Sequence, residues 1–201
     1  MPNNMIKEVV LATGNKGKIK EFSGLLDGVF GRVISLNDLE SPPEVVEDGA
    51  TFRDNALKKA RAVAGYSGMP ALADDSGLVV DSLGGRPGVF SARYAGEGAT
   101  DRDNIAKLLS ELRGIEDRNA RFVCVLALVT PDGMEITVEG TCEGVIMTKP
   151  RGGGGFGYDP VFYLPELGKT MAELPPEKKN TLSHRARAAE SLLKLLDEKA
   201  P

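Results

Sequence analysis

Apolar residues along the chain alternate between the spacing typical of strands and that typical of helices, and their order predicts strands that alternate with helices. A buried strand is predicted over residues 5–13, and apolar positions at helical spacing follow from Ile19 onward. A second strand is predicted over residues 32–36. The next helix is expected to begin after Thr51, whose hydroxyl suits an N-cap.

The rest of the chain continues this alternation. Thr100 and Asp103 resemble a capping box at the start of a third helix, and Ser183 is expected to cap a final one. The dipeptide Asp132-Gly133 predicts a hairpin turn. Further strands are predicted over residues 70–75, 77–83, 121–130 and 134–147. The pattern indicates an α/β fold on a long mixed sheet with flanking helices.

Length and composition restrict the class of protein. With 201 residues, 41% hydrophobic and 27% charged, we expect one domain over residues 1–201, possessing two lobes. The net charge of -4 without a basic stripe argues against a nucleic-acid partner. The longest apolar run, residues 122–129, is too short to cross a membrane. Residues 1–4 show no secretory signal, so a cytoplasmic location is expected.

The two cysteines carry no predicted chemistry. Cys124 and Cys142 flank the hairpin turn almost symmetrically, and in the cytoplasm we expect both to be reduced, buried thiols. Two cysteines and one histidine do not make a zinc site.

The first candidate site is the loop between the first strand and the first helix. A helix N-terminus offers backbone N–H groups and partial positive charge, which suit an anion such as phosphate. Glycines let the backbone approach a ligand, and lysines add full charge. The alternative is a plain turn with solvated lysines. The candidate ligand-binding residues are Thr13, Gly14, Asn15, Lys16, Gly17 and Lys18.

A second candidate is the acidic segment Asp74-Asp75-Ser76, which follows an apolar strand. Adjacent residues of a strand point to opposite faces, so at most one carboxylate is expected to face a shared cleft. That carboxylate could bind magnesium or act as a general base for water, with Glu47 as a second magnesium ligand. The alternative for the pair is an Asx turn that ends the strand.

The glycine-rich segment 151–157 contains a literal G-x-G-x-x-G. A strand and not a helix is predicted after it, which excludes a dinucleotide-binding fold. One interpretation is a mobile lid that brings Phe156 over a planar base, since an aromatic face can stack on a nucleobase. The other is a flexible surface loop.

The C-terminal cluster Lys178–Arg185 places two basic side chains in the first turn of the final helix. Cations there oppose the helix dipole, and a bound anion would remove the conflict. His184 and Arg185 are therefore candidates for ligand binding, although a lone histidine is commonly structural.

Taken together and in this order, the motifs resemble the inosine triphosphate pyrophosphatase family, and within it the bacterial members. Small departures are Phe90, Lys178 and Leu182, none of which is a candidate site residue. The resemblance covers nearly the whole chain and rests on residues 11–18, Thr51-Phe52 with Asn55-Ala56, residues 73–78, 84–94 and 155–160, and Ser183-His184-Arg185.

The resemblance implies an elongated two-lobed α/β fold, a homodimer and dependence on magnesium (Mg2+). It also implies hydrolysis of a nucleoside triphosphate to the monophosphate and pyrophosphate, with ITP, dITP and XTP preferred. This reaction would remove deaminated purines from the nucleotide pool before polymerases use them.

Roles for individual residues follow as hypotheses. Asp75 would deprotonate water and, with Glu47, hold the metal. The loop 13–18 and Lys179 would hold the triphosphate. His184 and Arg185 would donate to the 6-oxo group of the base, and Asp159 would accept from its N1 side. The remaining predicted substrate contacts are Ser76, Phe156, Gly157 and Tyr158.

Two alternatives remain open at this level. One is a related pyrophosphatase that prefers pyrimidine or modified nucleotides. The other is a non-catalytic nucleotide sensor, against which Asp75 argues, since a carboxylate next to phosphates is unfavourable without a metal.

Overall fold

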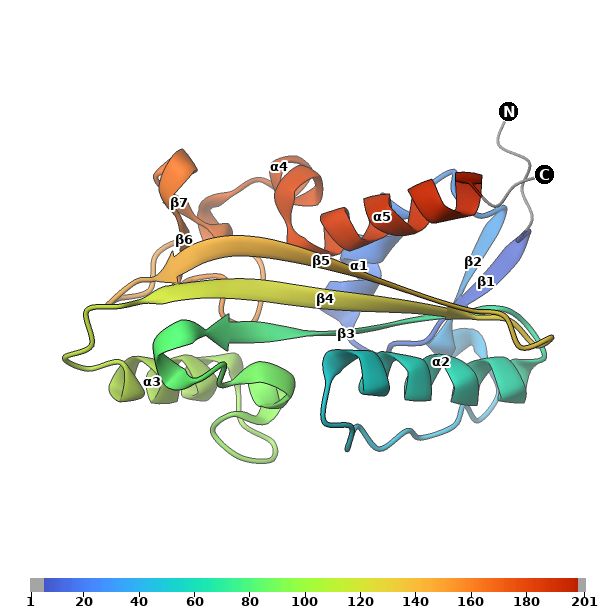
Figure 1. The fold of residues 1–201 in the computed structure, drawn as a ribbon, viewed down its shortest axis with the longest axis horizontal. Helices are drawn as coiled ribbons and strands as arrows, with labels where there is room; N and C mark the ends of the chain where they lie inside the picture. Colours follow the sequence, from blue (N-terminus) through green and yellow to red (C-terminus); the bar gives the residue numbers. More distant parts are fainter. Residues whose placement is uncertain (1–5, 199–201) are drawn as a thin grey trace. The chain divides into compact units, whose positions relative to one another are not determined.

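The computed structural model describes residues 6–198, so residues 1–5 and 199–201 lie outside the described part of the chain, including the segment predicted to lack a secretory signal. Seven strands form one sheet in the order β2-β1-β3-β4-β5-β6-β7 (Figure 1). The pairs β1–β2 and β1–β3 are parallel, whereas β5–β6 and β6–β7 are antiparallel, so the predicted mixed sheet is confirmed. The strands are β1 (Glu8–Leu11), β2 (Arg32–Ser35), β3 (Ala71–Val80), β4 (Asn119–Val129), β5 (Glu135–Ile146), β6 (Phe162–Leu164) and β7 (Lys169–Thr170).

Five α-helices and several short 3-10 turns connect the strands within the described residues. None of these helices is long and apolar enough to span a bilayer. The helices are α1 (Lys16–Leu25), α2 (Phe52–Ser67), α3 (Asp101–Glu111), α4 (Pro176–Leu182) and α5 (His184–Glu198).

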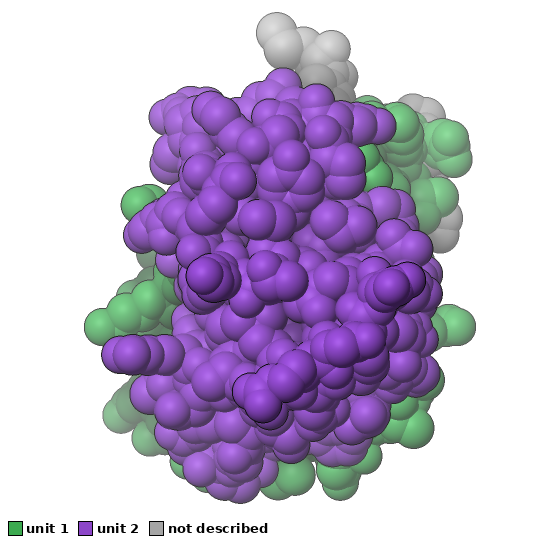
Figure 2. All heavy atoms as spheres, turned by 90° about the vertical axis from the view of Figure 1, so that its left-hand side faces the viewer, with its two compact units in different colours: residues 1–75, 124–140, 185–201 green, residues 76–123, 141–184 purple. Residues whose placement is uncertain are grey.

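The chain divides into two compact units, coloured separately in Figure 2. Unit 1 comprises residues 1–75, 124–140 and 185–201, and unit 2 comprises residues 76–123 and 141–184. Neither unit is continuous in sequence, because β3, β4 and β5 each contribute residues to both. That the whole chain behaves as one domain stays a prediction.

In unit 1, helices cover both faces of the strands, and the alternation of side chains shows why. On β1, Val9 packs in the cluster that contains α1 and α5 residues, whereas Val10 packs in the cluster of α2. The same alternation places Leu72 on the first face and Ala71 and Ala73 on the second. Strand β1 after Glu8 and the first half of β3 are therefore buried on both sides, as their continuous apolar runs require.

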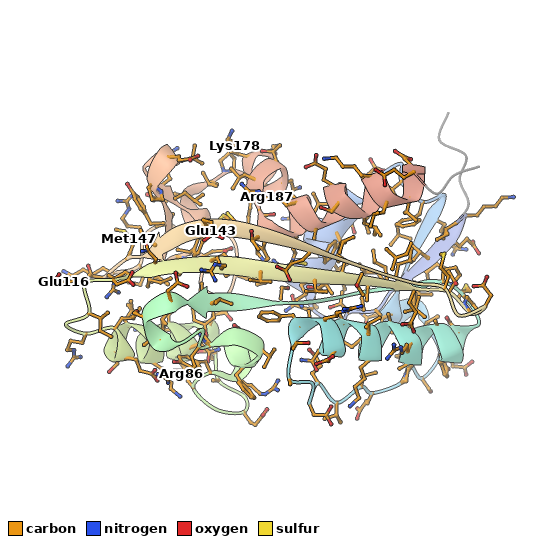
Figure 3. All side chains as sticks on the ribbon, in the orientation of Figure 1. Arg86, Glu116, Glu143, Met147, Lys178 and Arg187 are labelled. Atoms are coloured by element: carbon orange, nitrogen blue, oxygen red, sulfur yellow. The ribbon has the colours of Figure 1, made fainter. Side chains whose placement is uncertain are left out.

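Unit 2 has one hydrophobic core, in which α3 packs with the strand residues of this unit. Leu108 and Leu112 are fully buried there, together with Leu78 and Phe162. Arg86, labelled in Figure 3, lies at the surface of this unit. Its Nη1 is 2.9 Å from Oε2 of Glu111 on α3.

The caps at Thr51 and Thr100 and the hairpin follow the sequence predictions, whereas capping of α5 by Ser183 stays a prediction. Thr51 and Thr100 form capping boxes with Asp54 and Asp103, and α5 begins directly after Ser183. The amide of Gly133 donates to the carbonyl of Thr130 in the predicted turn, at 3.0 Å.

One prediction of local structure was wrong. Residues 70–75 and 77–83 do not form two strands around a turn at Asp75, because β3 continues through this segment to Val80. An Asx turn is therefore excluded there, and the two adjacent aspartates alternate across a regular strand. The residue types Asp, Ser and Gly suggested a break, but the segment stays extended within β3, which lies between β1 and β4 in the sheet.

Both cysteines are buried and free, as predicted. No cluster of three or more His, Cys, Asp or Glu side chains that could hold a metal ion occurs among residues 6–198.

Candidate active site

The loop that precedes α1 caps the helix with its own side chain. Asn15 Oδ1 accepts from the backbone N–H groups of Gly17 and Lys18, at 2.9 and 3.1 Å. Thr13 Oγ1 in turn accepts from the amide of Asn15 at 3.2 Å. Two amides that the sequence offered to an anion are thus used within the loop, so positive charge at this site comes chiefly from the side chains of Lys16 and Lys18.

Two other residues of the loop 13–18 remain open to a ligand. Gly14 and Lys16 are exposed, and a Cβ at Gly14 would meet no atom within 4 Å. Packing of the chain therefore does not require glycine at position 14. Glycine at this position would still allow a ligand to approach the backbone closely.

The strongest constellation in unit 1 surrounds Asp75 on the face that α2 covers. Its Oδ2 accepts from Asn55 Nδ2 at 3.0 Å, and its Oδ1 lies 3.9 Å from Lys59 Nζ. The same ammonium group lies 3.0 Å from Glu47 Oε2. One turn of α2 separates Asn55 from Lys59, so both point from one face of the helix toward β3.

Burial raises the pKa of Asp75 to about 6, since desolvation disfavours the carboxylate. Lys59 opposes this shift most strongly, followed by the hydrogen bond from Asn55 and the charge of Lys18, whereas Glu47 adds to it. The carboxyl is 5% exposed. A carboxyl poised near neutrality is what a general base needs, because it is ionised at pH 7 yet retains affinity for a proton.

Glu47 and Asp75 fit a magnesium site by their chemistry. Carboxylate oxygens are the hard ligands that magnesium selects, and the ion commonly uses one or two of them together with water and substrate phosphates. Both carboxylates are directed at one cation in the structure, namely the ammonium of Lys59.

Asn55 and Lys59 were not among the predicted site residues, although Asn55 belongs to one of the motifs that carry the family resemblance. Asn55 also ties down the preceding loop, because its Oδ1 accepts from the amide of Gly49 at 2.7 Å. A Cβ at Gly49 would lie 2.6 Å from that oxygen, so the contact requires glycine. Their spacing could have identified them in the sequence. Asn55 and Lys59 are polar residues four positions apart on the otherwise apolar face of α2, and both are buried.

Arg185 lies in unit 1 among carboxylates. Its Nη1 is 3.0 Å from Glu21 Oε2, its Nε is 3.8 Å from Asp74 Oδ2, and the residue is 4% exposed. Glu21 stabilises a buried guanidinium that would otherwise oppose the dipole at the start of α5. Its predicted donation to the base stays a prediction.

In unit 2, the predicted base-binding residues form a compact group of their own. Asp159 Oδ2 accepts from Lys179 Nζ at 2.7 Å and from the amide of Phe156 at 3.0 Å. The ammonium of Lys179 also lies 5.0 Å from the centre of the Phe156 ring, over its face. The structure therefore places Lys179 beside the residues predicted to bind the base, although the sequence assigned it to the triphosphate.

The glycine-rich segment that leads into this group is held at several points. Gly154 N donates to Ala172 O at 3.0 Å, and Gly157 N donates to Asp101 Oδ2 at 2.7 Å. Gly155 has a φ of 74°, and a Cβ there would collide with the Asp159 carboxylate. Glycine is thus needed at position 155 for both backbone conformation and space.

The remaining predicted contacts also belong to unit 2. His184 is 3% exposed and stacks on Phe122, with ring centres 4.8 Å apart and an interplanar angle of 16°. The hydroxyl of Tyr158 donates to the carbonyl of Ser91 at 2.9 Å, which anchors the segment after the loop. Ser76 is half-buried on β3.

Comparison with known proteins gives a consistent result. The Ham1 family model matches residues 9–195. A dITP/XTP pyrophosphatase of Geobacter sulfurreducens is 57% identical over 90% of this chain and 92% of its own length. One from Geobacillus kaustophilus is 57% identical over 93% of each chain.

Solved structures agree with the fold. The Ham1 protein of Staphylococcus aureus superposes with a TM-score of 0.87 at 43% identity, covering 96% of this chain and all of the other. A HAM1 protein from Coxiella burnetii has the same TM-score and coverage at 45% identity.

Proposed function

The chain belongs to the Ham1 family, as its motifs indicated, and we propose that it is a magnesium-dependent nucleoside-triphosphate pyrophosphohydrolase. Its substrates are dITP, ITP and XTP, and its products are the nucleoside monophosphate and pyrophosphate. The similarity to pyrophosphatases named for dITP and XTP, at 57% identity, supports this substrate class.

The observation that carries the proposal is the environment of Asp75. A buried carboxyl with a pKa near 6, held by an amide and facing an ammonium group, has the properties of a general base. A structural carboxylate would gain nothing from such burial, since desolvation lowers the stability of its charged form.

In the proposed reaction, a water oxygen attacks the α-phosphorus while Asp75 accepts a proton from that water. A new P–O bond forms, and the bond between the α-phosphorus and the bridging oxygen breaks. The electron pair of the broken bond leaves with pyrophosphate. Asn55 fixes the orientation of the Asp75 carboxylate, and Lys59 keeps it ionised.

Glu47 and Asp75 would hold the magnesium ion. Bound there, the ion would neutralise charge on the phosphates and polarise the reacting phosphoryl group. Lys18 and the loop 13–18 bind the triphosphate, and positive charge at this end lowers the cost of gathering its negative charges.

The glycine-rich segment and the first residues of α5 supply the groups that select the base in this proposal. His184 and Arg185 donate to the 6-oxo group of hypoxanthine or xanthine, and Phe156 stacks on the ring. Adenine presents a 6-amino donor instead, so its binding would leave facing donors unpaired. The fixed Asp159 carboxylate holds Lys179 beside Phe156, which makes Lys179 a part of the base end in this proposal.

A homodimer and a cytoplasmic location complete the proposal, both resting on the family resemblance and on composition. Sedimentation of the purified protein measures the first directly.

A pyrophosphate-release panel over ITP, XTP, GTP, ATP and dUTP, with and without EDTA, tests the function. We expect release from ITP and XTP with magnesium, far less from ATP, and none with EDTA. A preference for dUTP would favour a pyrimidine house-cleaning enzyme, and tight nucleotide binding without release would favour a sensor. Similar efficiencies for ATP and ITP would refute the proposed recognition of the 6-oxo group.

Lys179→Met tests the base end, with Lys178→Met as its matched control. Lys179 is buried against Asp159, whereas its neighbour Lys178 is exposed on α4 (Figure 3). We expect the first change to lower kcat/KM for ITP at least tenfold and the second to leave it within twofold. Equal effects of the two substitutions would argue against a specific role for Lys179.

A further inference from the structure

Asp74 differs from its neighbour Asp75 in both direction and surroundings. Along β3, Leu72 packs in the cluster of α1 and α5, whereas Ala71 and Ala73 pack against α2. Asp74 continues the face of Leu72 and Asp75 that of Ala73. The side chain of Asp74 is fully buried, with no accessible surface.

Asp74 belongs to a group of four charged side chains, of which two are buried and two are partly buried. Asp74 Oδ2 lies 2.9 Å from Lys18 Nζ and 3.8 Å from Arg185 Nε. Glu21, three residues after Lys18 on α1, holds Arg185 at 3.0 Å. Two cations are thus balanced by two carboxylates, and each cation has one of them at hydrogen-bond distance.

The distances between the charged groups show that Lys18, more than Arg185, relies on Asp74 as its ion-pair partner. Arg185 has a closer partner in Glu21, so it keeps an ion pair without Asp74. Lys18 has its short contact with Asp74, and its side chain is 14% exposed while Asp74 has no exposure. A ligand can therefore reach the ammonium group of Lys18 without displacing the carboxylate behind it.

We propose that Asp74 is a positioning residue that holds the ammonium group of Lys18 toward the phosphates of the substrate. This inference rests on the proposed function for the role of Lys18. One ammonium hydrogen is directed at Asp74, and the others remain for phosphate oxygens. Without the carboxylate, Lys18 and Arg185 would repel each other, and the flexible lysine side chain would leave this position.

The negative charge of Asp74 also has an effect on phosphate binding that opposes its positioning of Lys18. Removing a negative group near a phosphate site raises the local positive potential, which by itself would tighten binding of phosphate. We expect the positioning effect to be the larger one, because Asp74 Oδ2 lies 2.9 Å from Lys18 Nζ and its loss changes where the cation lies as well as the field around it. The two effects predict opposite signs, which makes the experiment decisive.

The test uses Asp74→Asn, which keeps the size of the side chain and removes its charge. Two quantities are measured, namely steady-state kinetics with ITP and calorimetric binding of inorganic triphosphate, which has no base. We expect KM for ITP and Kd for triphosphate to rise at least about tenfold while kcat stays within threefold. Asp81→Asn is the matched control, since Asp81 pairs with Arg121 on an exposed surface.

Lys18→Met supplies the second background. If Asp74 acts through Lys18, then adding Asp74→Asn to Lys18→Met changes neither KM for ITP nor Kd for triphosphate any further. The double variant should also resist denaturant better than Lys18→Met, because it lacks a buried carboxylate that has lost its closest cation. This comparison remains decisive if the single Asp74→Asn protein does not fold.

Unchanged or tighter triphosphate binding by Asp74→Asn would overturn the inference, as would a further loss of affinity on adding Asp74→Asn to Lys18→Met. Failure of the proposed function is a separate result. In that case wild-type protein releases no pyrophosphate from any nucleotide, while the binding comparison with inorganic triphosphate still decides the role of Asp74.

Discussion

Replacing Asp75 by Asn should make the protein more stable and catalytically inactive. The folded state raises the pKa of this carboxyl from 3.8 to about 6, chiefly by desolvation. A shift of this size corresponds to about 3 kcal/mol of unfavourable free energy for the ionised form, at about 1.4 kcal/mol per pKa unit. Asparagine has the size of the neutral acid and can still accept from Asn55, so at pH 8 we expect a gain of about 2–3 kcal/mol.

The gain should depend on pH in a defined direction. Because its folded pKa exceeds its unfolded pKa, Asp75 binds a proton more tightly in the folded protein. Lowering the pH from 8 through 6 toward 4 therefore stabilises the wild-type protein and not Asp75→Asn. The difference between them should fall to about half at pH 5 and to about a fifth at pH 4.

Denaturant unfolding at pH 8, 6 and 5 in EDTA measures this difference, and EDTA keeps magnesium from favouring the carboxylate. Turnover of ITP should fall by at least about 10²-fold, the lower end of what a general base supplies. Asp81→Asn should change stability by less than about 0.5 kcal/mol at every pH, as expected for an exposed position. An Asp75→Asn protein that is less stable than wild type at pH 8, or a pH-independent difference, would refute the reasoning.

The remaining predictions concern the loop and the partner lysine. Gly155→Ala should lower kcat/KM for ITP at least tenfold and reduce Tm, because its Cβ collides with a buried carboxylate, whereas Gly153→Ala, with open space around it, should change neither. In wild type, kcat/KM should fall below pH 6 as Asp75 takes up a proton. Lys59→Met should move that acid limb to higher pH by removing a charge that lowers the pKa, and Lys58→Met, an exposed change on the same helix, should not. Coincident profiles for the two lysine variants would contradict this account.

Local signals predicted much of the fold, because they depend on neighbouring residues in the chain. The capping pair Thr100 and Asp103, the hairpin turn at Gly133 and the apolar face of α2 were all readable from spacing. The break predicted at Asp75 was wrong because it, too, was inferred only from neighbouring residues in the chain. Turn residues favour a turn only locally, and here their place inside the long strand β3 of the sheet outweighs that preference.

The candidate site divides in the same way. Residue types and order identified Asp75, Lys18 and the segment after Gly155 as candidates, since their chemistry is written in the sequence. Sequence could not say that Asn55 holds Asp75 or that Lys59 faces it, because each contact joins residues far apart along the chain.

What the sequence determined by itself was most of the helices and strands, the family, and many of the chemical groups that the site contains. Only the tertiary structure decided how those groups act. It gave Asp74 and Asp75 to opposite faces of one strand, placed Lys179 beside Phe156, and used Asn15 to occupy two amides expected to bind an anion. The physical reason is that charge, desolvation and hydrogen bonding depend on distance in space, which a linear pattern does not encode.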